Sequence, residues 1–162
     1  MRFTIVSTGA LRAAFRIRGL GEQAANCRPA MEEIYMMILE IEDEIFESGG
    51  ARGGRQEWHP LSHDWLTSKW NRGKNVFVLQ EDGTLRDSVT RWRHPLQYTR
   101  IERSKIVFRS QRPFADLHQK GEGGMPKREF IYFTKLDAER FAQQIKQHVM
   151  SRRAGGPSLA AG

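Results

Sequence analysis

The sequence predicts an α+β fold in which a small antiparallel sheet packs against two long helices and the connections are long loops. Three observations support this fold class. Apolar residues recur at helical spacing through residues 29–48. Two short apolar runs flank a tight turn within residues 97–110. A second amphipathic stretch, residues 136–149, follows a glycine-rich bend and a short apolar run.

The stretch Pro29–Ser48 is the clearest helix in the sequence. Pro29 suits the first turn, where its missing N–H costs no hydrogen bond, and a glycine pair ends the helix. The apolar stripe consists of Met31, Ile34, Ile38, Ile41 and Ile45, widened by Tyr35, Leu39 and Phe46. We expect the stripe to pack on the domain's own sheet and the acidic residues to face water. The alternative is a subunit contact formed with the help of Met36, Met37 and Phe46.

The sheet is predicted from a first strand, Arg2–Ser7, a hairpin, and a last strand, Glu129–Thr134. The hairpin joins residues 97–102 to residues 105–110. β-Branched and aromatic residues dominate these segments, and such side chains suit a pleated, half-buried surface. The two long helices are expected to cover this sheet.

Three shorter helical stretches are expected elsewhere. The first is marked by apolar residues at helical spacing: Leu11, Ala14, Phe15 and Ile17. The second begins at Ser62, whose hydroxyl suits an N-cap, and reaches about Trp70. Its inward-facing residues are predicted to be Leu61, Trp65 and Leu66. The third is a helical turn at Leu85–Val89.

Length and composition indicate one domain, residues 1–153, with a flexible C-terminal tail at residues 154–162. No apolar run reaches the roughly 20 residues of a membrane span, and the N-terminus lacks the pattern of a secretory signal. Cys27 is the only cysteine, which excludes an intrachain disulfide and a cysteine-rich metal site. We therefore expect no membrane partner and assembly in a reducing cytoplasm.

Charge is unevenly distributed along the chain. Residues 21–48 hold eight acidic residues against one arginine, a local charge of −7, so the other residues carry +14 and the whole chain +7. Such polarity is typical of subunits that associate head to tail, but it also fits a solvated acidic helix on a basic domain. Basic surface attracts phosphate, and without a helix-turn-helix, zinc-finger or RNA-binding signature any DNA contact would be independent of sequence.

No residue pattern near the short helix that begins at Ser62 predicts catalysis or metal binding. Ser62, His63 and Asp64 are adjacent, whereas a catalytic triad needs side chains that converge from separate elements. His59 and His63 stand four apart, but Pro60 lies between them and no third metal ligand is near. The sequence therefore implies no metal.

His118 and Gln119 form the other pair that could be considered for catalysis. Neither a carboxylate nor a nucleophile stands at a supporting position, so the preferred interpretation is a His118 that braces the glycine bend through a hydrogen bond. Phosphate-binding and dinucleotide-binding glycine motifs are missing from the sequence. We predict that the chain is not an enzyme and takes no cofactor.

Several short motifs stand in a fixed order along the chain, the central ones within Arg112–Phe133. Their residues are Trp58, Pro60, Leu61 and Ser62; Gly83, Leu85 and Ser88; Phe114, Ala115, His118, Gln119 and Gly121; and Pro126, Arg128 and Phe130. Together with the amphipathic helix expected at residues 136–149, these motifs resemble the virion-morphogenesis or tail-completion family of tailed bacteriophages over about residues 50–150. Phe114 stands where members often carry Tyr, and Lys127 where they carry small residues.

The resemblance implies a structural protein of the virion, assembled in the host cytoplasm. It would form a ring of identical subunits, six by expectation, that joins or completes the head–tail neck around the DNA passage. Its partners would be copies of itself, head-closure or connector proteins, and tail terminator or tail tube proteins, with DNA passing through the lumen without sequence recognition. Contacts are expected from the C-terminal tail and two loops, at Arg52, Arg55, Gly123, Gly124 and Met125.

Three other functions are open at this point. A tail terminator that caps the tail tube would do the same class of work at an adjacent position in the particle. A free nucleic-acid-binding protein would bind DNA in isolation, in a salt-dependent manner. An enzyme, with activity depending on His118, is the last of the three.

Overall fold

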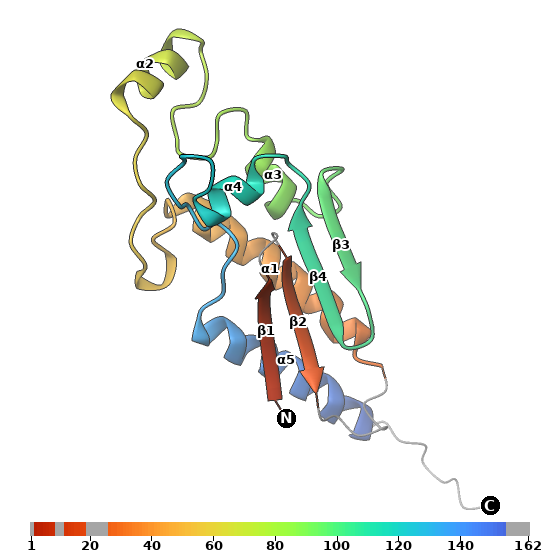
Figure 1. Cartoon of the computed structure of the whole chain (residues 1–162). Coiled ribbons are helices and arrows are strands. Elements are labelled where there is room, and N and C mark those ends of the chain that lie inside the picture. Colours follow the sequence, from red (N-terminus) through yellow and green to blue (C-terminus); the bar gives the residue numbers. More distant parts are fainter. Residues whose placement is uncertain (1, 9–11, 19–25, 155–162) are drawn as a thin grey trace, which may run out of the picture.

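The computed structural model of the chain describes residues 2–8, 12–18 and 26–154, and it confirms the predicted α+β class (Figure 1). Four antiparallel strands form the sheet, in the order β1-β2-β4-β3. They are β1 Arg2–Thr8, β2 Arg12–Arg18, β3 Gln97–Ile101 and β4 Lys105–Ser110. Figure 1 shows the long helices α1 and α5 passing behind this sheet. The last eight residues, most of the predicted flexible tail, lie outside the described part of the chain.

Helix α1, Arg28–Glu47, confirms the helix predicted from the apolar stripe. All five residues of the stripe are buried, because this face of α1 packs on α5 and the sheet. Phe46 is buried as well, so it belongs to the core; Met37 is half-buried and Met36 is exposed. The helix start is fixed to the sheet by the Cys27 amide, which donates to the Arg103 carbonyl at the β3–β4 turn (3.1 Å).

Residues 12–18 form a strand, so the helical turns predicted from Ala14, Phe15 and Ile17 are wrong. The residues from Phe15 to Arg18 alternate apolar and basic, a period of two that suits a strand. Antiparallel partners on both sides settle the conformation: Phe15 pairs with Ile5 of β1 and Ile106 of β4. The first of the predicted helical residues, Leu11, lies outside the described residues.

The segment predicted as a last strand, Glu129–Thr134, is irregular and joins no sheet. Phe130, Ile131 and Tyr132 are buried, with Phe130 fully enclosed, and Phe133 is half-buried. The backbone of the segment, however, bonds to a side chain: Gln119 Oε1 accepts from the amides of Phe130 (2.9 Å) and Ile131 (3.1 Å), and Gln119 Nε2 donates to the Ile131 carbonyl (2.8 Å). A glutamine side chain thus takes the place of a neighbouring strand.

The remaining elements are short, except for the last helix. They are the 3-10 turn η2 Arg52–Gly54, α2 His63–Asn71, α3 Thr84–Thr90, α4 Ala115–Lys120 and α5 Lys135–Ala154. Ser62 caps α2 as predicted, since its Oγ accepts from the Trp65 amide (3.4 Å). None of the helices in the described residues is long and apolar enough to cross a membrane.

Helix α2 does not pack inward, so the prediction that Trp65 and Leu66 face the core is wrong. Both side chains are exposed, and the one buried residue of the helix is Lys69. Figure 1 shows α2 at the tip of a long excursion, away from the sheet and from the long helices α1 and α5.

Candidate assembly site

The motif residues meet where the loop after α1 crosses the segment before α5. The Trp58 indole donates to the Glu129 carbonyl (2.8 Å), and its ring packs edge-on against Phe46, with centroids 5.3 Å apart. Gly50 lies against the same ring at φ +89°, and a Cβ there would fall 2.4 Å from the indole nitrogen. Only glycine meets both demands at this position.

Arg128 ties the upstream and central motifs together. Its guanidinium is buried and donates to the carbonyls of His59 (3.0 Å) and Pro60 (3.2 Å). Its amide donates to the His118 carbonyl (2.8 Å). Gly121 ends α4 at φ +75°, and a Cβ there would lie 2.8 Å from Lys127 Cβ. These motif residues therefore hold three distant segments in register.

The other motif residues divide between the core and the surface. Gly83 precedes α3 at φ +74°, and Ser88 Oγ lies 2.7 Å from Ser110 Oγ, which links α3 to β4. Ala115 and Phe130 are buried, while Leu61, Leu85 and Pro126 are half-buried. Phe114 and Pro60 are exposed.

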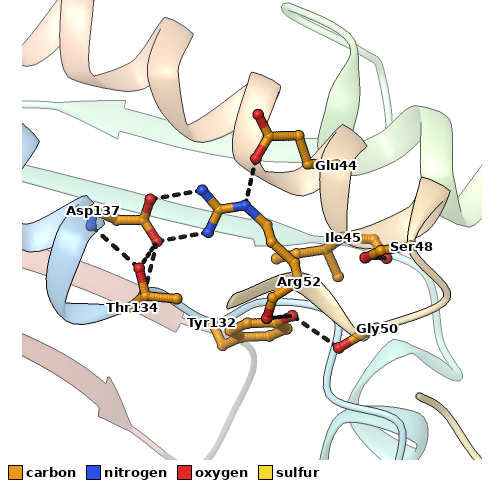
Figure 2. A network of polar contacts seen from close by, with 8 residues as sticks. All are labelled: Glu44, Ile45, Ser48, Gly50, Arg52, Tyr132, Thr134 and Asp137. Carbon is orange, nitrogen blue, oxygen red and sulfur yellow. Dashed lines mark hydrogen bonds and ion pairs between the residues drawn. The ribbon is translucent and has the colours of Figure 1, made fainter. Parts of the chain in front are cut away.

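A network of charged side chains fastens the loop after α1 to the start of α5 (Figure 2). Both terminal nitrogens of Arg52 donate to the Asp137 carboxylate at 2.7 Å, and Arg52 Nε donates to Glu44. Asp137 Oδ2 also accepts from the amide (2.8 Å) and hydroxyl (2.7 Å) of Thr134. The Tyr132 hydroxyl lies within hydrogen-bond distance of the carbonyls of Gly50 (2.9 Å) and Arg52 (3.1 Å).

Burial and pairing act in opposite directions on the ionisation of this network. Burial raises the pKa of Asp137, but hydrogen bonds from Arg52 and Thr134 and the charge of Arg52 bring it below its ordinary value. The hydrogen bond to Asp137 is the largest cause that raises the pKa of Arg52. Both groups are therefore charged at neutral pH, as a bidentate pair.

Glu42 is a buried acid that the sequence prediction placed in water with the other acids of α1, and that prediction is wrong. Its side chain is fully buried, and neither carboxyl oxygen has a hydrogen-bond partner among the described residues. Burial raises its pKa well above the ordinary value, although the charge of Arg52 acts the other way. A signal was present: position 42 lies four residues after Ile38 and three before Ile45, within the apolar stripe.

Asp137 was also missed, although the sequence held a sign of it. Thr134 and Asp137 stand three apart at the start of a helix, the spacing of a capping box. The Asp137 amide donates to Thr134 Oγ1 (3.3 Å), which completes this arrangement. Its pairing with Arg52 had no sequence signal, because the two residues come from separate parts of the chain.

The two loops expected to contact neighbouring subunits differ in how many contacts their residues make within the chain. In the first loop Arg52 pairs with Asp137, while the Arg55 guanidinium lies 4.1 Å from the centre of the Tyr132 ring and pairs with Glu129. In the second loop Gly123 and Gly124 are exposed and Met125 is half-buried. Their role in subunit contacts stays a prediction.

The candidate catalytic groups are not brought together. His63 and Asp64 are exposed, with 3.9 Å between the imidazole and the carboxylate, and the part of the chain described holds no cluster of three metal-ligating side chains. His118 braces the chain through its backbone carbonyl rather than its ring: Nδ1 has no partner among the described residues. Burial, followed by the charges of Arg128 and Lys69, lowers the pKa of His118.

The motif residues act by holding loops and distant segments of the chain in place, as in a structural protein. Residues 9–150 match the model of the phage virion morphogenesis family, and the chain belongs to that family. Its role is therefore structural, in the assembly of the phage particle. No curated protein and no solved structure shows significant similarity to the chain.

Proposed function

We propose that the protein joins the phage tail to the head, as a closed ring of six identical subunits around the DNA channel. Each subunit would contact copies of itself, head-closure or connector proteins on one side, and tail terminator or tail tube proteins on the other. DNA would pass through the lumen without sequence recognition. The protein would then reside at the neck of the virion.

The observation that supports this proposal best is the way the loop after α1 is fastened. Arg52 binds it to Asp137 at the start of α5, and Tyr132 binds it by two backbone carbonyls. A rigid core that holds its loops at fixed places on the surface suits a ring subunit, because every copy then offers its neighbours the same contact surface. A ring needs heterologous contacts that close on themselves.

Imaging of phage made without the protein tests the proposal against a tail terminator. A phage with a nonsense mutation in this gene would be grown with and without complementation, and its particles examined by electron microscopy. The neck role requires filled heads and tails of normal length that stay separate. Over-long tails would instead assign the terminator role. In complemented phage, a gold-labelled antibody should mark the head–tail junction.

DNA binding by the purified chain tests the remaining structural alternative. A neck subunit meets DNA only within an assembled ring, so the isolated chain should bind duplex DNA weakly. Tight binding that falls steeply with added salt would favour a free nucleic-acid-binding protein.

A further inference from the structure

The excursion that carries α2 displays apolar side chains at its tip. We define residues 62–77 as the aromatic arm. Trp70 is 76% exposed, Phe77 66% and Trp65 46%, and Leu66 beside them is exposed as well. Figure 1 shows α2 standing away from the sheet and from the other helices. Isolated exposed apolar residues are ordinary, but three aromatic side chains on one short arm mark a contact surface.

A groove that is open to solvent lies elsewhere on the same chain. Two open hollows, of about 810 and 550 Å³, run between α1 and the segment from α3 to the start of β3. Met36 and Trp92 line both hollows, so the two lie side by side, and these side chains are 46% and 58% exposed. We call the two hollows together the Met36–Trp92 groove. In the folded chain the arm does not fill this groove, so each surface remains open.

Each surface also carries an exposed charge that is opposite to one on the other surface. The groove is lined by five acids, Glu32, Glu33, Glu40, Asp43 and Asp87, and by four arginines, Arg28, Arg86, Arg91 and Arg93. Three of these arginines pair with Glu32, Asp43 and Asp87. The arm carries three cations, Lys69, Arg72 and Lys74, of which Lys69 is buried. Within the described residues Glu40 and Lys74 take part in no ion pair, whereas Arg72 pairs with Glu81 (3.2 Å). Glu40 and Lys74 are therefore available to each other across a contact.

We infer that the aromatic arm of one copy binds in the Met36–Trp92 groove of the next copy. Arm and groove are different surfaces of one chain, so the contact is heterologous, and repetition around an axis closes a ring. The exposed parts of the three aromatic side chains offer roughly 400 Å² of mainly apolar area, about half of what one partner buries in a standard interface. This inference rests on the proposed ring and specifies how neighbouring subunits join.

Two single substitutions and their mixture test the contact on the full-length chain. Trp70→Asp disables the arm and Met36→Asp disables the groove; both side chains are largely exposed, so circular dichroism should show unchanged folding. By sedimentation velocity the wild type should form a closed oligomer and each variant alone a monomer, with association at least about 30-fold weaker. An equimolar mixture should form dimers and nothing larger, because only one intact arm and one intact groove can pair.

A charge exchange between arm and groove supplies a second, independent test. Lys74→Glu and Glu40→Lys should each weaken association by about three- to tenfold, and the double exchange should restore it. Lys146→Glu, the same charge change on the exposed side of α5, should have no effect. Failure of the double exchange to restore association would show that these two residues do not face each other.

The possible failures separate this inference from the neck proposal. If the wild type forms rings and Trp70→Asp forms them equally well, the arm is not the contact, and the ring stands. If the wild type is monomeric up to its solubility limit, copies do not bind through this groove. Should Trp70→Asp then be lost from particles, the arm binds another virion protein, which also overturns the inference. Imaging of the neck decides the proposed function in each case.

Discussion

Both terminal nitrogens of Arg52 donate to the carboxylate of Asp137 at 2.7 Å, although 85 residues separate the two in sequence. The pair joins the loop after α1 to the first turn of α5 (Figure 2). Asp137 is fully buried, so removal of Arg52 would leave a buried carboxylate without its ion-pair partner. This gives the pair its large effect on stability when one member is removed.

Replacement of Arg52 by alanine should destabilise the fold strongly. It leaves Asp137 unpaired and removes the positive charge beside Glu42, and breaking a buried pair in this way costs about 3–5 kcal/mol. Urea denaturation followed by circular dichroism measures the free energy of unfolding. Arg55→Ala is the matched control: its ion pair with Glu129 is partly exposed, so the loss should be about 1 kcal/mol or less. Equal losses would contradict the buried role of Arg52.

Glu42 makes the stability depend on pH in a direction opposite to that of paired acids. Burial raises its pKa in the folded state above that in the unfolded chain, about 4.3. The folded state thus holds the proton more tightly, and this contribution is complete below the unfolded pKa and is lost as pH rises through the folded pKa. The contribution of Glu42 to stability therefore falls as pH rises above about 4.3.

Glu42→Gln should remove that pH dependence, because the amide has the shape of the protonated acid and cannot ionise. Its free energy of unfolding should exceed that of the wild type by a margin that disappears near pH 4 and grows as pH rises towards the pKa of folded Glu42. Urea titrations of both proteins at a series of pH values measure the margin. Glu40→Gln, on the exposed side of α1, should show no such trend, and a pH-independent margin for Glu42→Gln would refute the assignment.

The contact between Gly50 and Trp58 predicts a strong position effect for alanine. Gly50→Ala combines a left-handed backbone with overlap on the indole, so the loss should reach about 3 kcal/mol or more. Gly54 has a similar φ, +78°, but open space where a Cβ would stand. Gly54→Ala should therefore cost only about 1–2 kcal/mol. Thermal and urea unfolding of the two variants separates the effect of the overlap from that of the backbone.

The long helices and the hairpin could be predicted because their signals are local. The stripe of α1 runs from Met31 to Ile45, about four helical turns, and the β3–β4 hairpin is closed by a short turn. Residues 12–18 could not be assigned from the spacing of Ala14, Phe15 and Ile17 alone, because that spacing fits one helical turn as well as a strand. Pairing with β1 and β4 decides between them, and that pairing depends on the tertiary fold.

The candidate site could be predicted as a set of residues but not as an arrangement. The motifs placed Trp58, Gln119 and Arg128 among the important positions, and the structure shows that they hold loops together. Their partners are backbone groups of distant segments, which leave no pattern in the sequence. The aromatic arm was misjudged for a related reason: the apolar residues of α2 look like core residues unless the excursion that carries them is known.

Gln119 offers the sharpest test of this internal bracing. Gln119→Leu keeps the size of the side chain but removes two acceptor contacts and one donor contact to the backbone of residues 130–131, for a loss of about 2–3 kcal/mol. Hydrogen exchange should show the amides of Phe130 and Ile131 losing protection more than those of α1, because only the former bond to Gln119. Gln143→Leu, on the exposed surface of α5, is the control and should leave both sets unchanged. Retained protection at Phe130 and Ile131 would mean that other groups satisfy this segment and that Gln119 does not replace a strand.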